Sequence, residues 1–208
     1  PTFNIYAASR DLMRARNADW HATYTLPSLW TYFQSTRDNH VSYFFDWTTS
    51  NEVAWRRFYE RWMRLMNDYK NMGGRVTTGS DSGFIFQIFG YGYVRELELL
   101  QEAGFNPLEV LRSATGLGAE LLGIDGETGS VEVGKAADLL VLDENPLDDF
   151  KLLYGTGALR LNDDTGKPEW RRALRHTIRA GLVFDCDGLL ADVRAMVAAQ
   201  KEAEGAGA

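Results

Sequence analysis

At 208 residues, the chain is long enough for one sizeable domain, or for one domain and part of a second. Its formal net charge of -7 argues against a surface for phosphate groups, so nucleic acid is not an expected partner. No apolar run approaches the roughly 20 residues that span a bilayer, and a membrane partner is not expected either. The single cysteine, Cys186, excludes an internal disulfide and a cysteine-built zinc site.

The chain opens with the letters PTFNIY, without an initiator methionine or a signal-peptide pattern. We interpret residues 1–8 as the end of a β-strand that begins upstream. A charged stretch from Ser9 or Arg10 to Trp20 is expected to be helical. Because any targeting signal would lie upstream, the sequence leaves the compartment undetermined.

Residues 20–69 carry 14 of the 26 aromatic residues. Residues 51–72 predict a helix that Gly73 ends, with large apolar side chains on one face and charged ones on the other. We expect this face to pack in the core: Trp55, Phe58, Tyr59, Trp62, Leu65, Met66 and Tyr69. The stretch from Trp20 to Trp47 is interrupted by Pro27. For this stretch we keep three interpretations: packing in the core, a lid, or a pocket wall. Aromatic residues between Tyr6 and Trp47 are candidates for one wall of a substrate pocket.

The segment from Gly73 to Gly83 reads GGRVTTGSDSG. Residues 75–78 predict a short strand, and Asp81 follows directly after the strand breaks. Residues just past the C-terminal end of a parallel strand face the ligand crevice of a barrel or an open sheet. An alternative is that Asp81 only bonds its own backbone in a turn.

A helix is expected over residues 94–103, ended by Gly104. A second helix begins after Asn106, because Asn caps, Pro suits the first helical position and Glu109 can reach back to the cap. We expect this helix to end near Gly123.

The pattern changes to that of strands after residue 126. Residues 130–133 and 138–143 predict a hairpin-like unit, and residues 177–184 predict a strand pair around Gly181. These strands suggest a small β-domain, followed by a helix over residues 189–203.

Two further motifs suggest phosphate chemistry. Residues 129–136 nearly spell a P-loop, but Ala136 stands where a Ser or Thr is required. Residues 182–189 resemble the nucleophile motif of haloacid dehalogenase-like phosphatases, in which Asp185 would attack phosphorus and Asp187 would act as acid and base. Since only 20 residues follow Gly188, we favour a turn and a helix cap there.

The histidines His21, His40 and His176 are scattered, with no paired metal-binding spacing. We interpret each of them as a surface or hydrogen-bonded residue.

Three motifs stand in one order: TGSDSG at residues 78–83, GFNPLEVLRSAT at 104–115 and GSVEVGKAADLLVL at 129–142. Together they resemble the C-terminal part of a metal-dependent amidohydrolase-superfamily enzyme, in the imidazolonepropionase-like and dipeptidase-like branch. The resemblance is strong over residues 73–146 and looser over 177–184.

The resemblance implies an α/β fold: the last two strands and helices of a (β/α)8 TIM-type barrel, with strands of a small β-sandwich. Residues 1–123 would form the barrel portion with an aromatic-rich helical insertion, residues 124–188 the sandwich strands, and residues 189–208 the last helix and a frayed tail.

The resemblance also implies that Asp81 contacts a divalent metal, zinc in the first place, and takes a proton from the attacking water. The reaction would be hydrolysis of a C–N bond, amide or cyclic amide, in a small-molecule substrate. Zinc needs at least three protein ligands, and this chain supplies one at most. We therefore expect a C-terminal fragment that is inactive alone. The alternative is a non-catalytic half-barrel that assembles with a partner, and a homo-oligomer stays open.

Overall fold

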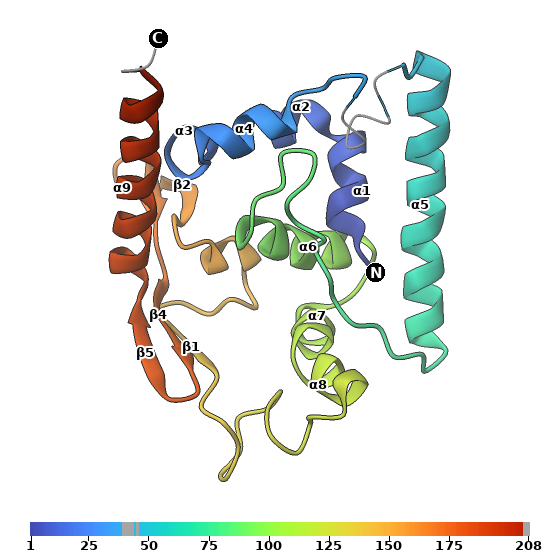
Figure 1. The fold of residues 1–208 in the computed structure, drawn as a ribbon. Coiled ribbons are helices and arrows are strands. Elements are labelled where there is room, and N and C mark those ends of the chain that lie inside the picture. Colours follow the sequence, from blue (N-terminus) through green and yellow to red (C-terminus); the bar gives the residue numbers. More distant parts are fainter. Residues whose placement is uncertain (39–43, 45, 206–208) are drawn as a thin grey trace.

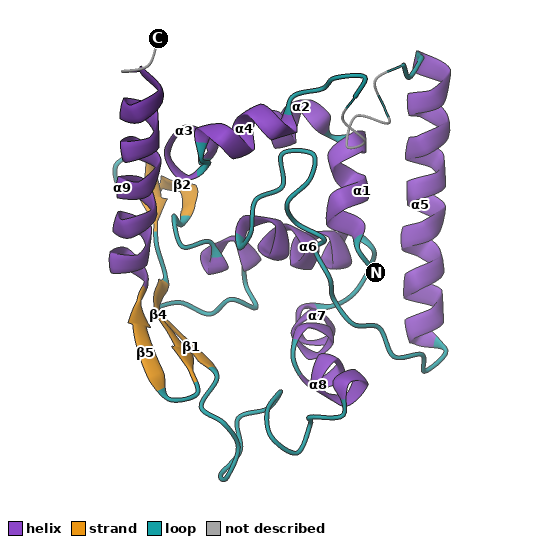
Figure 2. Cartoon of the chain, viewed as in Figure 1, coloured by secondary structure: helices purple, strands orange, loops and turns teal. Residues whose placement is uncertain are grey.

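Helices dominate the first two thirds of the chain, and small antiparallel sheets lie toward its C-terminal end (Figures 1 and 2). The computed structural model describes residues 1–38, 44 and 46–205. Its helices are α1 (Phe3–Arg10), α2 (Leu12–Arg16), α3 (His21–Tyr24), α4 (Pro27–Phe33), α5 (Thr49–Asn71), α6 (Tyr91–Glu102), α7 (Pro107–Ala114), α8 (Gly116–Leu122), the 3-10 helix η2 (Phe150–Leu153) and α9 (Cys186–Gly205).

The strands form two separate sheets. β1 (Leu139–Leu142), β4 (Leu174–Arg179) and β5 (Leu182–Asp185) form a three-stranded sheet in the order β1-β4-β5. β2 (Ala158–Asn162) and β3 (Lys167–Arg171) form a two-stranded hairpin. All of these pairings are antiparallel. Helix α9 leaves the end of β5 and rises beside α3 and α4 (Figure 1).

Helix α1 lies between two apolar clusters and is the centre of the helical part. Phe3 and Ala7 belong to the cluster that α1 shares with α5, α6 and α7. Ile5 and Ala8 belong to a second cluster, which contains Phe33 and three residues that precede α6. Apolar side chains on opposite faces of one helix explain why it is buried between its neighbours.

The long helix predicted over residues 51–72 is confirmed as α5. Its buried face is rotated from the predicted one, because Tyr59 and Met63 are buried while Phe58 is 53% and Leu65 58% exposed. Trp62 and Met66 of the predicted face are partly buried and pack against the same apolar cluster as Tyr59 and Met63, so part of that face reaches the core.

Two strand predictions near the ends of the helical part are wrong. Residues 3–10 form helix α1, and residues 75–78 form an irregular connection between α5 and α6. A strand is stable only when a neighbour pairs its backbone. Within the described part of the chain no strand lies beside either segment, so the described residues do not form barrel strands.

The second half of the chain follows its predictions more closely. The Asn106 cap, the strand over 139–142, the strand pair around Gly181 and the last helix are confirmed. Residues 130–133 are not a strand, and β1 pairs with β4 instead. The helix after Asn106 breaks at Thr115 into α7 and α8.

The structure adds the β2–β3 hairpin, which the sequence analysis missed. Among the described helices, none combines the length and apolar character that crossing a bilayer requires.

Candidate functional site

Asp81 lies in the turn between α5 and α6 and is exposed to solvent. Its φ angle is 46°, in the left-handed region that Asp and Asn tolerate better than most residues. Gly83, Ile85 and Phe86 also have positive φ angles, so the chain reverses several times before α6 begins. Non-glycine residues in this region persist only where the surrounding structure holds them, and they are frequent at functional sites.

The turn is held on both sides of Asp81. The side-chain amide of Asn4 donates to the carbonyl of Ser80 at 3.3 Å. The hydroxyl of Ser82 donates to the hydroxyl of Ser80 at 3.0 Å. Upstream, the hydroxyls of Thr78 and Tyr93 lie 2.7 Å apart, which ties the connection to α6.

The carboxylate of Asp81 has no hydrogen-bond or ion-pair partner among the described residues. The alternative in which Asp81 bonds its own backbone is therefore not seen in this structure. An exposed carboxylate without protein partners is free to accept a proton or to contact a ligand.

Glu96, which the sequence analysis missed, is a fully buried carboxyl group in α6. Its Oε2 atom accepts the backbone N–H of Asn4 at 2.6 Å. Burial raises the pKa of Glu96 to about 8, and the hydrogen bonds from the backbone of Asn4 and Phe3 oppose this rise. A signal existed in the sequence, because Glu96 falls four residues after Gly92 and four before Leu100 on the apolar face.

The residues that could hold a metal do not form a site by themselves. Among the described residues, no three His, Cys, Asp or Glu side chains gather closely enough to bind an ion. Asp81 is a single carboxylate, and zinc requires at least three protein ligands. The described residues therefore do not fit a complete metal centre, and Asp81 stays the one predicted ligand.

The three histidines noted in the sequence lie in different surroundings. The ring nitrogens of His21 contact the Thr25 hydroxyl and the Ala15 carbonyl, each at 2.8 Å, as expected for a hydrogen-bonded histidine. His176 is only partly buried and lies on β4. His40 lies outside the described residues.

The two aspartates of the phosphatase-like motif also have structural roles. Asp185 Oδ2 accepts the backbone N–H of Gly188 at 2.7 Å, which makes it the cap of α9. Asp187 pairs with Arg172. The turn and helix cap that we favoured there are confirmed.

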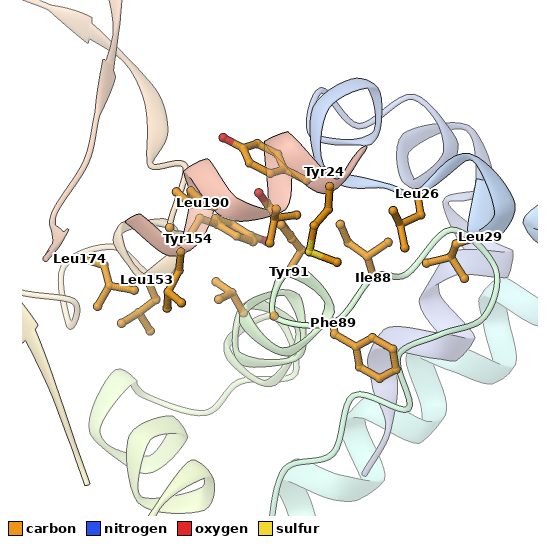
Figure 3. Close-up of a pocket in the computed structure, with 16 residues that line it drawn as sticks. Tyr24, Leu26, Leu29, Ile88, Phe89, Tyr91, Leu153, Tyr154, Leu174 and Leu190 are labelled. Atoms are coloured by element: carbon orange, nitrogen blue, oxygen red, sulfur yellow. The ribbon is translucent and has the colours of Figure 1, made fainter. Parts of the chain in front are cut away.

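An apolar cavity of about 490 Å³ lies between α9, the α3–α4 region and the start of α6 (Figure 3). Ile88, Phe89 and Tyr91 line one side, and Leu190 and Tyr24 another. Tyr24 is thus one aromatic residue between Tyr6 and Trp47 that lines a pocket. Trp20, Trp30 and Phe33 belong to the second apolar cluster, against which Tyr24 also packs. Trp20 and Trp30 line other, separate pockets. Tyr43 and Phe45 lie outside the described residues. Asp81 is not among the residues lining this cavity.

The family of the chain is shown by its sequence. The sequence profile of the amidohydrolase family matches residues 11–165, which is most of the chain and includes Asp81. The chain belongs to the amidohydrolase family, and the resemblance drawn from its motifs is confirmed. Members of this superfamily typically use a divalent metal.

Individual relatives match shares of this chain that range from 25% to 87%. A 5'-deoxyadenosine deaminase from Methanobrevibacter smithii is 42% identical over 52 residues, which are 25% of this chain and 12% of that protein. A candidate prolidase from Bifidobacterium longum is 33% identical, with a TM-score of 0.49 over 72% of this chain and 34% of its own. A Xaa-Pro dipeptidase with bound methionine is 19% identical, with a TM-score of 0.50 over 87% of this chain and 33% of its own. The chain thus spans 12% to 34% of the length of these three proteins.

Proposed function

We propose that this chain is the C-terminal part of a hydrolase that adds water to a carbon atom and breaks its bond to nitrogen. Asp81 is the residue that moves the proton. The observation that carries the proposal is the Asp81 turn: an exposed, unpaired carboxylate, held from both sides, within the segment that matches the amidohydrolase family.

The proposed role follows from the chemistry of a free carboxylate. Water must lose a proton to attack, and the departing nitrogen must gain one to leave. A carboxylate that touches no other protein group can accept the first proton and deliver it in the second step. The deaminase relative agrees with a reaction of this class, because deamination also replaces a C–N bond by a C–O bond.

In the complete protein, we propose that residues 1–123 adjoin the strands of a (β/α)8 barrel and that residues 124–188 contribute to a small β-sandwich. A divalent metal, zinc in the first place, would take its other ligands from outside the described residues. Asp81 would be the contact from this chain.

The experiment uses the protein that carries this sequence together with its complete coding region. Two substrate classes are assayed: 5'-deoxyadenosine by ammonia release, and dipeptides and N-acyl amino acids by amine release. We expect Asp81→Asn to lower kcat by about 10²- to 10⁴-fold, the range for removal of a proton-transfer group. Asn is nearly isosteric and tolerates the left-handed backbone, so the turn is expected to survive the change.

Asp185→Asn is the matched control, because it removes one carboxylate and leaves a residue that caps helices equally well. Its kcat is expected to stay within about twofold of the wild type, a level that corresponds to under roughly 0.5 kcal/mol. Equal activities of wild type and Asp81→Asn would refute the role of Asp81. Absence of hydrolysis by the complete protein on both substrate classes would favour the non-catalytic chain instead.

A further inference from the structure

Asn4 connects helix α1 to the turn that carries Asp81. Its side chain is fully buried, although Asn is mostly an exposed residue. The side-chain amide donates to the carbonyl of Ser80, which directly precedes Asp81, and the backbone N–H donates to the buried carboxyl of Glu96 in α6. Asn4 therefore joins two helices and the turn at one point.

Gly92 in α6 makes this close approach possible. A Cβ atom at this position would stand 2.8 Å from Nδ2 of Asn4 and would overlap the hydroxyl of Ser82. Asn4 and Ser82 thus lie against the backbone of Gly92, and both also hold the turn. Asn4 donates to the carbonyl of Ser80, and Ser82, directly after Asp81, donates to the hydroxyl of Ser80.

The buried polar groups of this junction are not all satisfied. Within the described part of the chain, Oδ1 of Asn4 and Oε1 of Glu96 have no hydrogen-bond partner. A partly satisfied buried network stabilises a fold less than apolar side chains of the same shape. Stability alone therefore does not explain why position 4 carries an amide side chain.

We propose that Asn4 is a positioning residue, which holds the Ser80 carbonyl and thereby aims the Asp81 carboxylate at the reacting atoms. The inference rests on the proposed function of Asp81. The hydrogen bonds of Asn4 go to Ser80 and Glu96 and not to Asp81, so its effect on the reaction passes through the backbone of residues 80–82. A displacement of about 1 Å in a reacting group can lower a rate about 100-fold.

Asn4→Leu in the complete protein is the principal test, since Leu has a similar shape and lacks the amide donor. We expect kcat to fall about 10- to 100-fold while KM changes less than about threefold. We also expect amide hydrogen exchange at residues 80–83 to accelerate at least tenfold, with the melting temperature unchanged or raised. Ser82→Ala removes the hydroxyl on the other side of Asp81 and should lower kcat about two- to tenfold. This variant is the second test of how the turn is held, in case Asn4→Leu fails to fold.

Asn67→Ala is the control, because Asn67 also has a buried, unpartnered amide oxygen but lies on α5, outside this junction. It should leave kcat and exchange at residues 80–83 unchanged. Unchanged exchange in Asn4→Leu, or unchanged kcat where Asp81→Asn is inactive, would overturn the proposal. The exchange measurement needs no substrate, so it decides whether Asn4 holds the turn even if Asp81 proves not to be catalytic.

Discussion

The carboxyl group of Glu96 accepts the backbone N–H of Asn4 at 2.6 Å, across 92 positions of the sequence. This contact fastens the first turn of α1 to the middle of α6, and both groups are fully buried. Their chain neighbours Phe3 and Leu97 belong to the larger apolar cluster. A carboxyl group in such surroundings resists ionisation because charge is poorly solvated there.

The stability of the fold should consequently depend on pH through Glu96. The pKa of Glu96 is about 8 in the folded chain, and the ordinary pKa of a Glu side chain is 4.5. Between pH 4.5 and pH 8 the folded state therefore holds one more proton than the unfolded state. Raising the pH through this window favours unfolding, by about 1.4 kcal/mol per pH unit. The contribution of the protonated Glu96 to the stability of the fold is complete below about pH 4.5 and is lost as the pH reaches 8.

Glu96→Gln tests this dependence, because Gln stays neutral and keeps an oxygen that can accept the N–H of Asn4. Urea denaturation at several pH values from 5 to 8 should show a flatter profile than the wild type, and a more stable variant at pH 8. Glu109→Gln is the control, because Lys70 and the backbone of Asn106 lower the pKa of Glu109. This replacement should leave the loss of stability between pH 5 and pH 8 unchanged. A wild-type profile that is flat over this range would contradict the buried, protonated Glu96.

Two helical glycines should respond in opposite directions to replacement by Ala. At Gly92 the new Cβ would overlap Ser82 and press on Asn4, and we expect a loss of about 1–3 kcal/mol, as for other overpacked sites. At Gly118 in α8 the nearest atom is 4.0 Å away, and Ala should stabilise the helix by up to about 1 kcal/mol. Free energies of unfolding of the two variants check this, and a stabilised Gly92→Ala would show that the junction has room.

Features encoded by neighbouring residues could be predicted from the sequence. The cap at Asn106, the long helix α5 and the strand pair around Gly181 each depend on side chains or turns within a few positions. They are confirmed because local geometry is enough to determine them.

Features that need distant partners could not be predicted in this way. Residues 75–78 have the composition of a strand, but a strand requires a paired neighbour, and none lies beside them in the described residues. Asp81 was predicted as a site residue because it stands in a family motif. Asn4 and Glu96 were missed because their contact spans most of the helical part, and no local pattern marks an Asn that bonds a turn 76 positions away.

The cap of α7 offers a test of a feature that the sequence predicted. The side chain of Asn106 accepts the N–H of Glu109 at 3.0 Å, and Glu109 returns a bond to the N–H of Asn106 at 2.8 Å. Asn106→Ala removes half of this reciprocal cap and should cost about 1 kcal/mol. Asn106→Ser, which restores a capping oxygen, should recover most of that loss in the same denaturation experiment. Equal stabilities of the Ala and Ser variants would show that the cap contributes little.

The hydroxyl of Tyr59 donates to the carbonyl of Phe3 at 2.8 Å, in a fully buried contact between α5 and α1. Tyr59→Phe keeps the ring and its packing against Phe3 but removes the donor. We expect the free energy of unfolding to fall by about 0.5–1.5 kcal/mol, the usual net contribution of one buried hydrogen bond. Tyr69→Phe on the same helix is the control: its ring is 45% exposed, and the change should stay within about 0.5 kcal/mol. Similar small effects at both positions would mean that water replaces the lost donor at Phe3, and that α1 is less tightly enclosed by α5 than the contact distance indicates.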